Sequence, residues 1–241
     1  MAFLLPHAPR QPVFRAPAVV LLLISALVAA HVAYTMMPPG LSLAWINRFA
    51  FIPAHYGTGF PSHASLPDLL AGGLPFLTYM ALHNDYIHLT INCLWLFAFG
   101  PIVARQFGTV LFLLFFAICG VAGAMAHLAF NWGSPAPVIG ASGAISGLMA
   151  AGIRLLPTEQ PAWAIAGPPT DAPLLPLWSR QIILFSLVWA AINLLAGITG
   201  LGMQGQVGLI AWQAHLGGYI AGLFLSGLFD RLRPLPVGEA L

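Results

Sequence analysis

Two polar residues in strongly apolar surroundings have the types and settings that acyl-transfer chemistry requires. Ser142 lies in the segment Gly-Ala-Ser-Gly at residues 140–143, and its hydroxyl is a candidate nucleophile. His215 lies in Ala-His-Leu-Gly-Gly at residues 214–218, and imidazole is the side chain best suited to accept a hydroxyl proton near neutral pH. No Asp or Glu occurs in either apolar stretch, so the predicted chemistry is a Ser-His dyad without a third, acidic member.

A second pair of polar residues has the spacing of one helical face. His88 and Asn92 are four residues apart, so in a helix their side chains point the same way. Two such donors could stabilise the negative charge that develops on a carbonyl oxygen under attack. Hydrogen bonding between helices is the alternative interpretation of this pair.

Each candidate also has a structural interpretation. Serine favours the N-cap of a helix on its own account, so Ser142 could serve only as a cap. The segment also departs from the Gly-x-Ser-x-Gly elbow of soluble hydrolases, because residue 144 is Ala. A membrane histidine such as His215 often only hydrogen-bonds a neighbouring helix.

Small residues near both candidates have the spacing that lets helices touch. Gly218 and Gly222 follow His215 at an interval of four, and Gly143 and Gly147 follow Ser142 at the same interval. Glycines in this pattern allow backbones to approach closely. Packing of these two faces would bring His215 toward Ser142, and Gly140 would let other backbone approach the serine.

The composition determines which kind of element must hold these residues. Of 241 residues, 59% are hydrophobic and 6% are charged, whereas soluble domains carry about a quarter charged residues. The sequence therefore predicts an all-helical, polytopic membrane protein. Its eight basic residues are all Arg and form no basic run, so nucleic acid is not an expected partner. Cys93 and Cys119 lie in apolar runs and predict no disulfide framework.

Six membrane-spanning segments are predicted, of which the fourth is unusually short. The fourth begins at Ser142 and ends near Pro157, which gives it a length of about 22 Å at about 1.5 Å per residue. A hydrocarbon core of roughly 30 Å is longer than this helix. The Gly- and Pro-rich residues 131–141 before it predict irregular backbone that enters the membrane from one side. The other five predicted spans are residues 16–37, 86–104, 108–130, 181–200 and 207–229.

The arginines predict the orientation of these spans. With six spans both termini lie on one side, and placing them in the cytoplasm satisfies the positive-inside rule. The first run could instead be a cleaved signal peptide, but it is long and five more spans follow. The predicted organisation is a cytoplasmic segment at 1–15, one membrane domain at 16–230 with an outer loop at 38–85 and a Pro-rich inner loop at 157–179, and a cytoplasmic tail at 231–241. Only Arg48 then lies outside; the inner arginines are Arg10, Arg15, Arg105, Arg154, Arg180, Arg231 and Arg233.

The polar residues of the spans argue against other membrane enzymes and carriers. No Glu lies in a span, so the His-Glu-x-x-His motif of zinc proteases is absent and no metal is expected. No Asp lies in a span either, which excludes an aspartyl dyad. Ion-coupled transport usually relies on buried charge and repeated halves, so a small-solute transporter is a weaker alternative. The polar residues of the spans are His31, His88, Asn92, His127, Ser142, Ser146, Asn193, Gln213 and His215; Asn193 and Gln213 are interpreted as helix-helix bonding residues.

The three polar groups in their chain order resemble one family. His88-x-x-x-Asn92, Gly140-x-Ser142-Gly143 and Ala214-His215-x-x-Gly218-x-x-x-Gly222 together closely resemble the rhomboid intramembrane serine proteases, over about residues 75–230. The resemblance implies that Ser142 attacks the scissile carbonyl, that His215 moves the proton, and that His88, Asn92 and the Ser142 amide stabilise the oxyanion. It implies no cofactor, and substrates that are membrane proteins whose transmembrane helix unwinds near small residues. A bacterial inner membrane is the expected location.

Two departures from the family pattern affect the surroundings of the site. Many members have Trp-Arg in the first outer loop, where this chain has Leu74-Pro75. Many also have an aromatic residue four positions after the serine that can stack on the base, where this chain has Ser146, so the bracing of His215 is not explained. A catalytically inactive, rhomboid-like scaffold that binds client helices is the main alternative to a protease.

Overall fold

The structure is a computed structural model that describes residues 16–57, 65–156, 174–199 and 211–233. Within these ranges the regular elements are all helices, and an isolated bridge between Phe51 and Val138 is the one β-type pairing. The predicted all-helical class is therefore confirmed. This outcome follows from the apolar sequence, since in lipid a helix satisfies its backbone hydrogen bonds within one segment.

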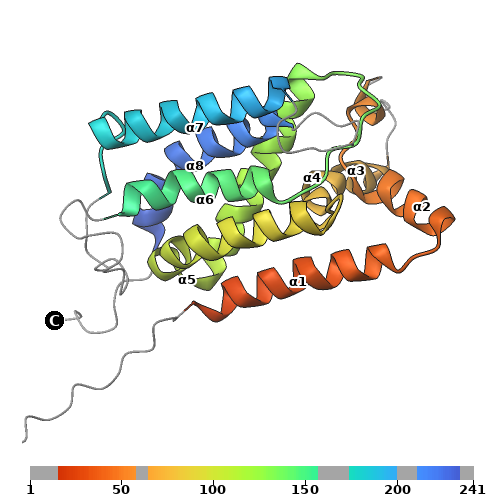
Figure 1. The fold of residues 1–241 in the computed structure, drawn as a ribbon, viewed down its shortest axis with the longest axis horizontal. Helices are drawn as coiled ribbons and strands as arrows, with labels where there is room; N and C mark the ends of the chain where they lie inside the picture. Colours follow the sequence, from red (N-terminus) through yellow and green to blue (C-terminus); the bar gives the residue numbers. More distant parts are fainter. Residues whose placement is uncertain (1–15, 58–64, 157–173, 200–210, 234–241) are drawn as a thin grey trace, which may run out of the picture.

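Five long helices run side by side and form the body of the molecule (Figure 1). Their bounds are α1 Ala18–Thr35, α5 Tyr86–Phe130, α6 Ser142–Leu155, α7 Arg180–Thr199 and α8 Trp212–Leu232. Helices α5, α6 and α8 contact one another most extensively, α1 packs against α5, and α7 has smaller contacts with α8 and α6. The helix that begins at Ser142 is thus enclosed, and 12 of its 14 residues are buried.

Helix α5 combines two of the predicted spans. The sequence predicts separate spans at 86–104 and 108–130, and in the structure two helical halves meet at Gly108, whose backbone is non-helical with a φ of 76°. A positive φ is readily accessible to glycine, so Gly108 allows a sharp change of direction here. Pro101 also lies within this helix, where it removes one backbone donor.

The predicted count of six spans is not confirmed. Among the described residues, three helices are long and apolar enough to cross a membrane, namely α1, α5 and α7. Helix α6 falls short in length with 14 residues, and α8 has 21 residues but is less apolar. These apolar helices nevertheless define a polytopic integral membrane protein. The start of the predicted sixth span, at 207–210, lies outside the described residues.

The predicted outer loop contains short helices. They are α2 Pro39–Phe49, η1 Pro53–Tyr56, α3 Leu66–Gly73, α4 Pro75–Thr78 and η2 Tyr79–Ala81. Proline stands at the start of several of them, where its fixed φ suits the first turn and its missing N–H costs nothing. Ser65 and Asp68 form a reciprocal capping box at the start of α3. The predicted inner loop at 157–179 lies mostly outside the described residues.

Close contact between α6 and α8 depends on glycine. A methyl group added at Gly218 would overlap the carbonyl oxygen of Gly143, and one added at Gly222 would overlap the backbone of Gly147. These are the pairs of small residues at intervals of four that the sequence predicts to face each other. The two backbones therefore touch at two points about one helical turn apart.

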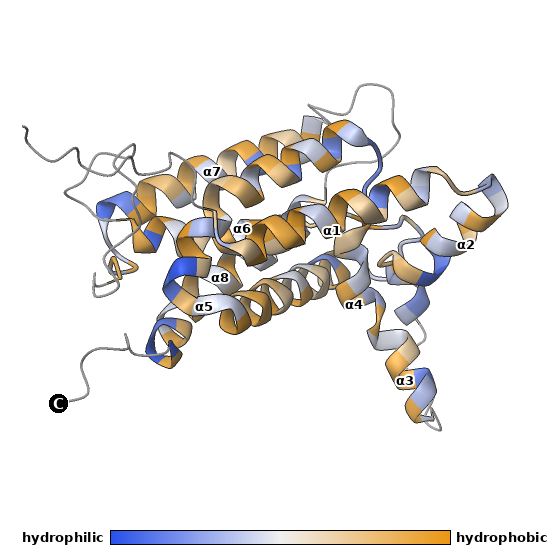
Figure 2. Ribbon diagram, turned by 90° about the horizontal axis from the view of Figure 1, so that it is seen from below, coloured by the Kyte–Doolittle hydropathy of each residue, from blue (hydrophilic) through white to orange (hydrophobic). Residues whose placement is uncertain are grey.

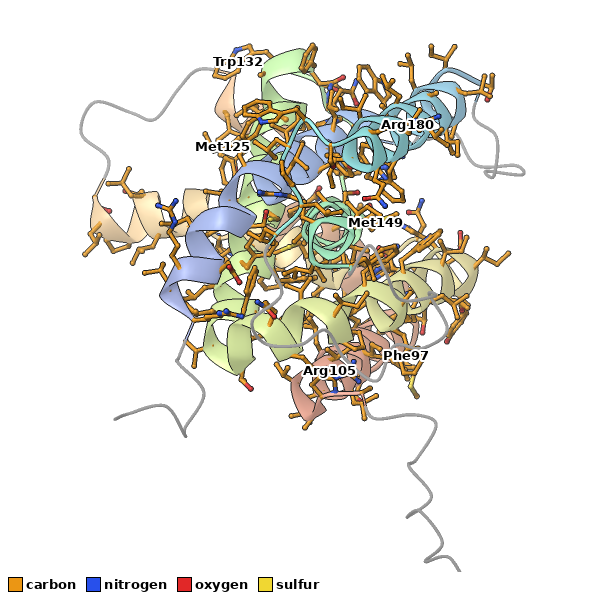
Figure 3. All side chains as sticks on the ribbon, turned by 90° about the vertical axis from the view of Figure 1, so that its left-hand side faces the viewer. Phe97, Arg105, Met125, Trp132, Met149 and Arg180 are labelled. Carbon is orange, nitrogen blue, oxygen red and sulfur yellow. The ribbon has the colours of Figure 1, made fainter. Side chains whose placement is uncertain are left out.

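Polar character gathers at the ends of the bundle. The long helices are mostly apolar along their length, and hydrophilic colour is concentrated at helix ends and on the short outer helices (Figure 2). The start of α7 and the ends of α6 and α8 lie at one end of the molecule, with the bend of α5, whereas α2 lies at the other (Figure 1). Figure 3 views the molecule from the first of these ends, where Arg105 and Arg180 are labelled.

Candidate active site

Ser142 and His215 meet where α6 begins. Ser142 is the first residue of α6, and His215 lies in the first turn of α8. The Oγ of Ser142 and the Nε2 of His215 are 2.7 Å apart, a hydrogen-bond distance. Neither residue is fully buried. This is the geometry that a nucleophile and its general base require.

The N-cap interpretation of Ser142 does not match the structure. The N-cap position of α6 is Ala141, and no side chain caps this helix. The hydroxyl of Ser142 is instead engaged with His215. Because the first N–H groups of a helix have no intrahelical partner, backbone donors are available beside Ser142.

His88 lies against Gly140, next to the serine. Gly140 has a φ of +118°, and a Cβ built on it would lie 2.8 Å from both Cε1 and Nε2 of His88. The same Cβ would be 3.8 Å from the Oγ of Ser142. Only glycine meets both requirements, since it tolerates this φ and leaves room for the ring. The imidazole of His88 thus reaches the neighbourhood of the serine hydroxyl.

Asn92 lies one turn further along α5 and is buried, with 3% of its surface exposed. Its Nδ2 donates to the carbonyl oxygen of His88 at 2.9 Å. A primary amide has two N–H groups, so one donor remains. Its Oδ1 is buried and has no hydrogen-bond partner among the described residues. Asn92 is therefore a buried polar group near His88, without a direct contact to Ser142 or His215 among its hydrogen bonds.

His215 has a second polar partner, on α7. The Oδ1 of Asn193 lies 2.7 Å from the Nδ1 of His215. The sequence interpretation treated Asn193 only as a helix-bonding residue. Ser146, which replaces the aromatic residue of many rhomboids, donates its hydroxyl to the carbonyl oxygen of Ser142 at 2.7 Å.

Three buried residues lie behind the site. The sequence analysis did not select Tyr79 or His83, and it named His31 without placing it near the site. Tyr79 is buried, donates to the Gly120 carbonyl at 2.8 Å and lies close to Gly143. His31 and His83 are both fully buried, and the ring of His83 meets that of His88 edge to face with centroids 5.1 Å apart. His83 precedes α5 and lies five residues before His88, so helical spacing gave no signal for this contact.

His83 lies before the start of α5 and stays neutral. Burial lowers the pKa of His83 to about 3, with smaller contributions from the neighbouring His88 and His31. An uncharged ring in this position packs against His88 without adding a positive charge beside the dyad.

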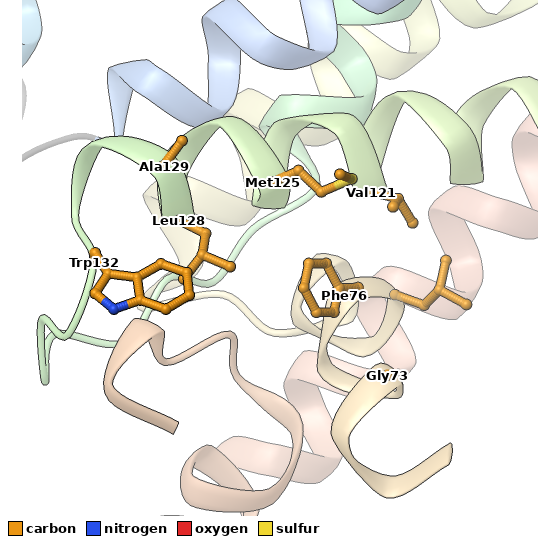
Figure 4. A pocket seen from close by; sticks show the side chains of 8 residues that line it. Gly73, Phe76, Val121, Met125, Leu128, Ala129 and Trp132 are labelled. Carbon is orange, nitrogen blue, oxygen red and sulfur yellow. The ribbon is translucent and has the colours of Figure 1, made fainter. Parts of the chain in front are cut away.

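A separate apolar cavity lies beside the second half of α5. It has a volume of about 510 Å³ and is lined by α4, the second half of α5 and Trp132. Figure 4 shows Phe76 facing Val121 and Met125 across it. None of the dyad residues lines this cavity. In the part of the chain that the structure describes, no group of three His, Cys, Asp or Glu side chains could hold a metal ion.

The fold and the site define an integral membrane protein of apolar helices in which a serine and a histidine from two closely packed helices share a hydrogen bond. A family model for the rhomboid domain matches residues 72–231. The chain belongs to the rhomboid family. The resemblance that the three motifs indicate is thereby confirmed.

Two curated relatives are similar over part of their length. "Rhomboid protease GluP" of Bacillus subtilis (strain 168) is 31% identical over 150 residues, which cover 62% of this chain and 25% of the relative. "RHOMBOID-like protein 6, mitochondrial" of Arabidopsis thaliana is 32% identical over 154 residues, which cover 62% of this chain and 41% of the relative. The chain thus spans less than half of the length of either protein.

Proposed function

We propose that this protein is an intramembrane serine endopeptidase that uses a Ser142-His215 dyad to cleave transmembrane segments of membrane proteins. The observation that carries the proposal is the 2.7 Å separation of Ser142 Oγ and His215 Nε2 at the start of an enclosed helix. Membership of a family that consists mostly of serine proteases supports it.

The proposed reaction follows from the atoms of the dyad. Ser142 Oγ attacks the scissile carbonyl carbon while its proton passes to His215 Nε2. The resulting imidazolium returns this proton to the leaving amine, and an ester between Ser142 and the substrate acyl group remains. Water then attacks the ester with His215 again as the base, which releases a carboxylate and frees the serine.

The oxyanion is proposed to lie between the start of α6 and the face of α5 that carries His88. The His88 ring, the remaining N–H of Asn92 and the Ser142 amide are the proposed donors. Placement of the His88 ring over Gly140, close to Ser142 Oγ, supports the first of these. Each such donor typically contributes a few kcal/mol to the transition state.

Six spans remain the proposed arrangement, as α1, the two halves of α5, α6, α7 and α8. Residues 86–107 and 109–130 of α5 form two halves that at about 1.5 Å per residue are each about 33 Å long, enough to cross a core of roughly 30 Å. The break at Gly108 is a natural point for a turn between two spans. Both termini are then proposed to be cytoplasmic, with water reaching the site from the opposite side, and a bacterial inner membrane is the proposed location.

The decisive experiment compares wild-type protein with Ser142→Ala in proteoliposomes that contain a model transmembrane substrate. We expect wild type to cut the substrate and Ser142→Ala to be inactive, whereas Ser42→Ala, which changes a partly exposed serine of α2, should cut normally. A fluorophosphonate should label Ser142 in the wild type. Equal cleavage by Ser142→Ala would contradict the proposal, and client binding without cleavage would favour the scaffold.

A further inference from the structure

Asn193 contacts the edge of the His215 ring that points away from Ser142. It lies on α7, whereas His215 lies on α8, and Asn193 Oδ1 is 2.7 Å from His215 Nδ1. The two ring nitrogens of His215 are therefore both engaged, one with the proposed nucleophile and one with an amide. This second contact links the dyad to a third helix.

A carbonyl oxygen on α7 determines which way the amide of Asn193 points. Nδ2 of Asn193 donates to the carbonyl oxygen of Trp189 at 2.9 Å, one turn earlier in the same helix. A carbonyl oxygen can only accept, so the NH₂ end must face Trp189. The Oδ1 end consequently faces His215, and it too can only accept.

The orientation of the amide determines the tautomer of His215. Because Oδ1 of Asn193 only accepts, Nδ1 of His215 must carry the hydrogen. In the neutral ring Nε2 then has a free lone pair, which accepts the Ser142 hydroxyl at 2.7 Å. Each group therefore donates to the next one. The Ser142 hydroxyl donates to Nε2 of His215, Nδ1 of His215 donates to Oδ1 of Asn193, and Nδ2 of Asn193 donates to the Trp189 carbonyl oxygen.

Helix α7 is anchored to α8 immediately beside Asn193. The rings of Trp189 and Tyr219 stack with centroids 4.1 Å apart and an interplanar angle of 18°. Ser186 and Tyr219 share a hydrogen bond of 2.8 Å between their hydroxyl oxygens. These two contacts fix the position of Trp189, whose carbonyl oxygen orients Asn193, relative to α8, which carries His215.

Other means of orienting His215 are lacking in the part of the chain that the structure describes. No aromatic ring stacks on it there, and the residue four positions after Ser142 is a serine whose hydroxyl is engaged with the Ser142 carbonyl. No carboxylate hydrogen-bonds it among the described residues. A neutral amide can orient the ring without placing a charge among apolar helices.

We propose that Asn193 is a positioning residue that holds His215 in the Nδ1-protonated tautomer, with Nε2 aimed at Ser142. The proposal rests on the proposed proteolytic function for its kinetic consequence. Its structural content, the tautomer of one histidine, can be measured independently of activity.

The kinetic test compares Asn193→Leu, which keeps the branching at Cγ but removes the acceptor, with Asn193→Asp, which keeps an acceptor. We expect Asn193→Leu to lower kcat about ten- to hundredfold with KM nearly unchanged, because a hydrogen bond to a ring that becomes charged is lost. Asn193→Asp should retain more activity, and the acid limb of its pH–rate profile should move to higher pH, since a carboxylate favours the imidazolium.

Gln181→Leu, at an exposed position of the same helix, is the matched control. It replaces a polar side chain of α7 by leucine but leaves the contact with His215 intact, so it should keep kcat within about twofold of wild type. An unchanged kcat in Asn193→Leu would overturn the proposal. Equal losses of kcat in Asn193→Leu and Gln181→Leu would also overturn it, because they would indicate only that α7 tolerates leucine poorly.

Nitrogen-15 NMR of wild-type protein with labelled histidine reports the tautomer directly. The His215 signals are assigned by their absence in His215→Ala. We expect a protonated Nδ1 and an unprotonated Nε2 at neutral pH, and the opposite tautomer would refute the proposal even if every Asn193 variant failed to fold. If wild type and Ser142→Ala showed equal cleavage, the proposed function would fail while this measurement still tested Asn193.

Discussion

Replacing Gly218 by Ala should separate the dyad. The added methyl group would overlap the carbonyl oxygen of Gly143, and on the other side it would lie 3.2 Å from the carbonyl oxygen of Cys119. Both neighbours are backbone atoms, which cannot move aside as a flexible side chain could. Helix α8 is therefore confined between α6 and α5, and it must move away from α6 by roughly 1.5 Å to restore ordinary contact.

This displacement acts almost directly on the reacting atoms. Gly143 is adjacent to Ser142, and Gly218 lies about one turn after His215. A shift of roughly 1.5 Å would lengthen the present 2.7 Å separation to about 4 Å, which is no longer a hydrogen bond. We expect kcat to fall about a hundredfold and the free energy of unfolding to fall by about 1–3 kcal/mol.

The assay measures cleavage of a model transmembrane substrate and thermal unfolding in the same detergent. Gly227→Ala on the same helix is the matched control, because its methyl group would meet only the Nη1 of Arg154, at 3.8 Å. Wild-type kcat and an unchanged melting temperature for Gly218→Ala would refute the reasoning. A loss of equal size in Gly227→Ala would show that alanine is harmful anywhere in α8.

Three further predictions concern the surroundings of the dyad. His88→Ala should lower kcat by about 10²–10³ while KM stays similar, because an oxyanion donor is lost; His55→Ala, at an exposed position, should leave kcat unchanged, and an active His88→Ala would exclude this role. Arg154→Met should destabilise the fold by about 2 kcal/mol or more in thermal unfolding, since the Leu175 and Leu223 carbonyls and Ser226 lose their donor; the exposed Arg180→Met should be nearly neutral, and a stable Arg154→Met would contradict the assigned contacts. Burial lowers the pKa of folded His83 to about 3 from its ordinary value of 6.5, so protons bind the unfolded state preferentially and stability should decline as pH falls from 6.5 toward 3, by about 2 kcal/mol at pH 5; a pH dependence of unfolding in His83→Phe as steep as that of wild type would contradict this.

The helical class and the positions of the candidate residues could be predicted because their signals are local. Long apolar runs specify helices in lipid whatever their neighbours. A serine or histidine inside such a run is conspicuous, and glycines at intervals of four mark the face that touches another helix. These signals suffice to pair the face of Ser142 with that of His215, although their catalytic roles stay predictions.

The partner of Asn193 could not be predicted because it depends on contact between two helices. Whether Asn193 meets His215 is decided by the register of α7 against α8, which the Trp189–Tyr219 stack helps to set. No spacing within α7 encodes that register. The short outer helices were missed for a related reason, since helices of this length are marginal alone and are held by contacts such as the Thr78 hydroxyl donating to the Phe49 carbonyl at 2.8 Å.

The break in α5 could be placed from the sequence to within a few residues, because residues 105–107 interrupt the apolar run. The sequence pattern separates two spans at this point, and in the structure the helical backbone breaks at Gly108. Gln106 is one of the polar residues that made this stretch resemble a loop. In the structure Gln106 is buried, and its Nε2 donates to Oδ1 of the distant Asp230 at 2.7 Å.

Because α6 is shorter than the hydrocarbon core, the depth of Ser142 in the membrane depends on the thickness of the bilayer. Its 14 residues rise about 21 Å, so Ser142 sits about 9 Å beneath the outer boundary of a 30 Å core when the inner end of α6 lies at the inner boundary. For the proposed protease, a thicker bilayer would submerge the serine further and present a different stretch of each client helix to it, and a thinner one would raise it toward the headgroups. Lipid thickness thus becomes a variable that selects the scissile bond, in the same way that it sorts helices of different length among membranes.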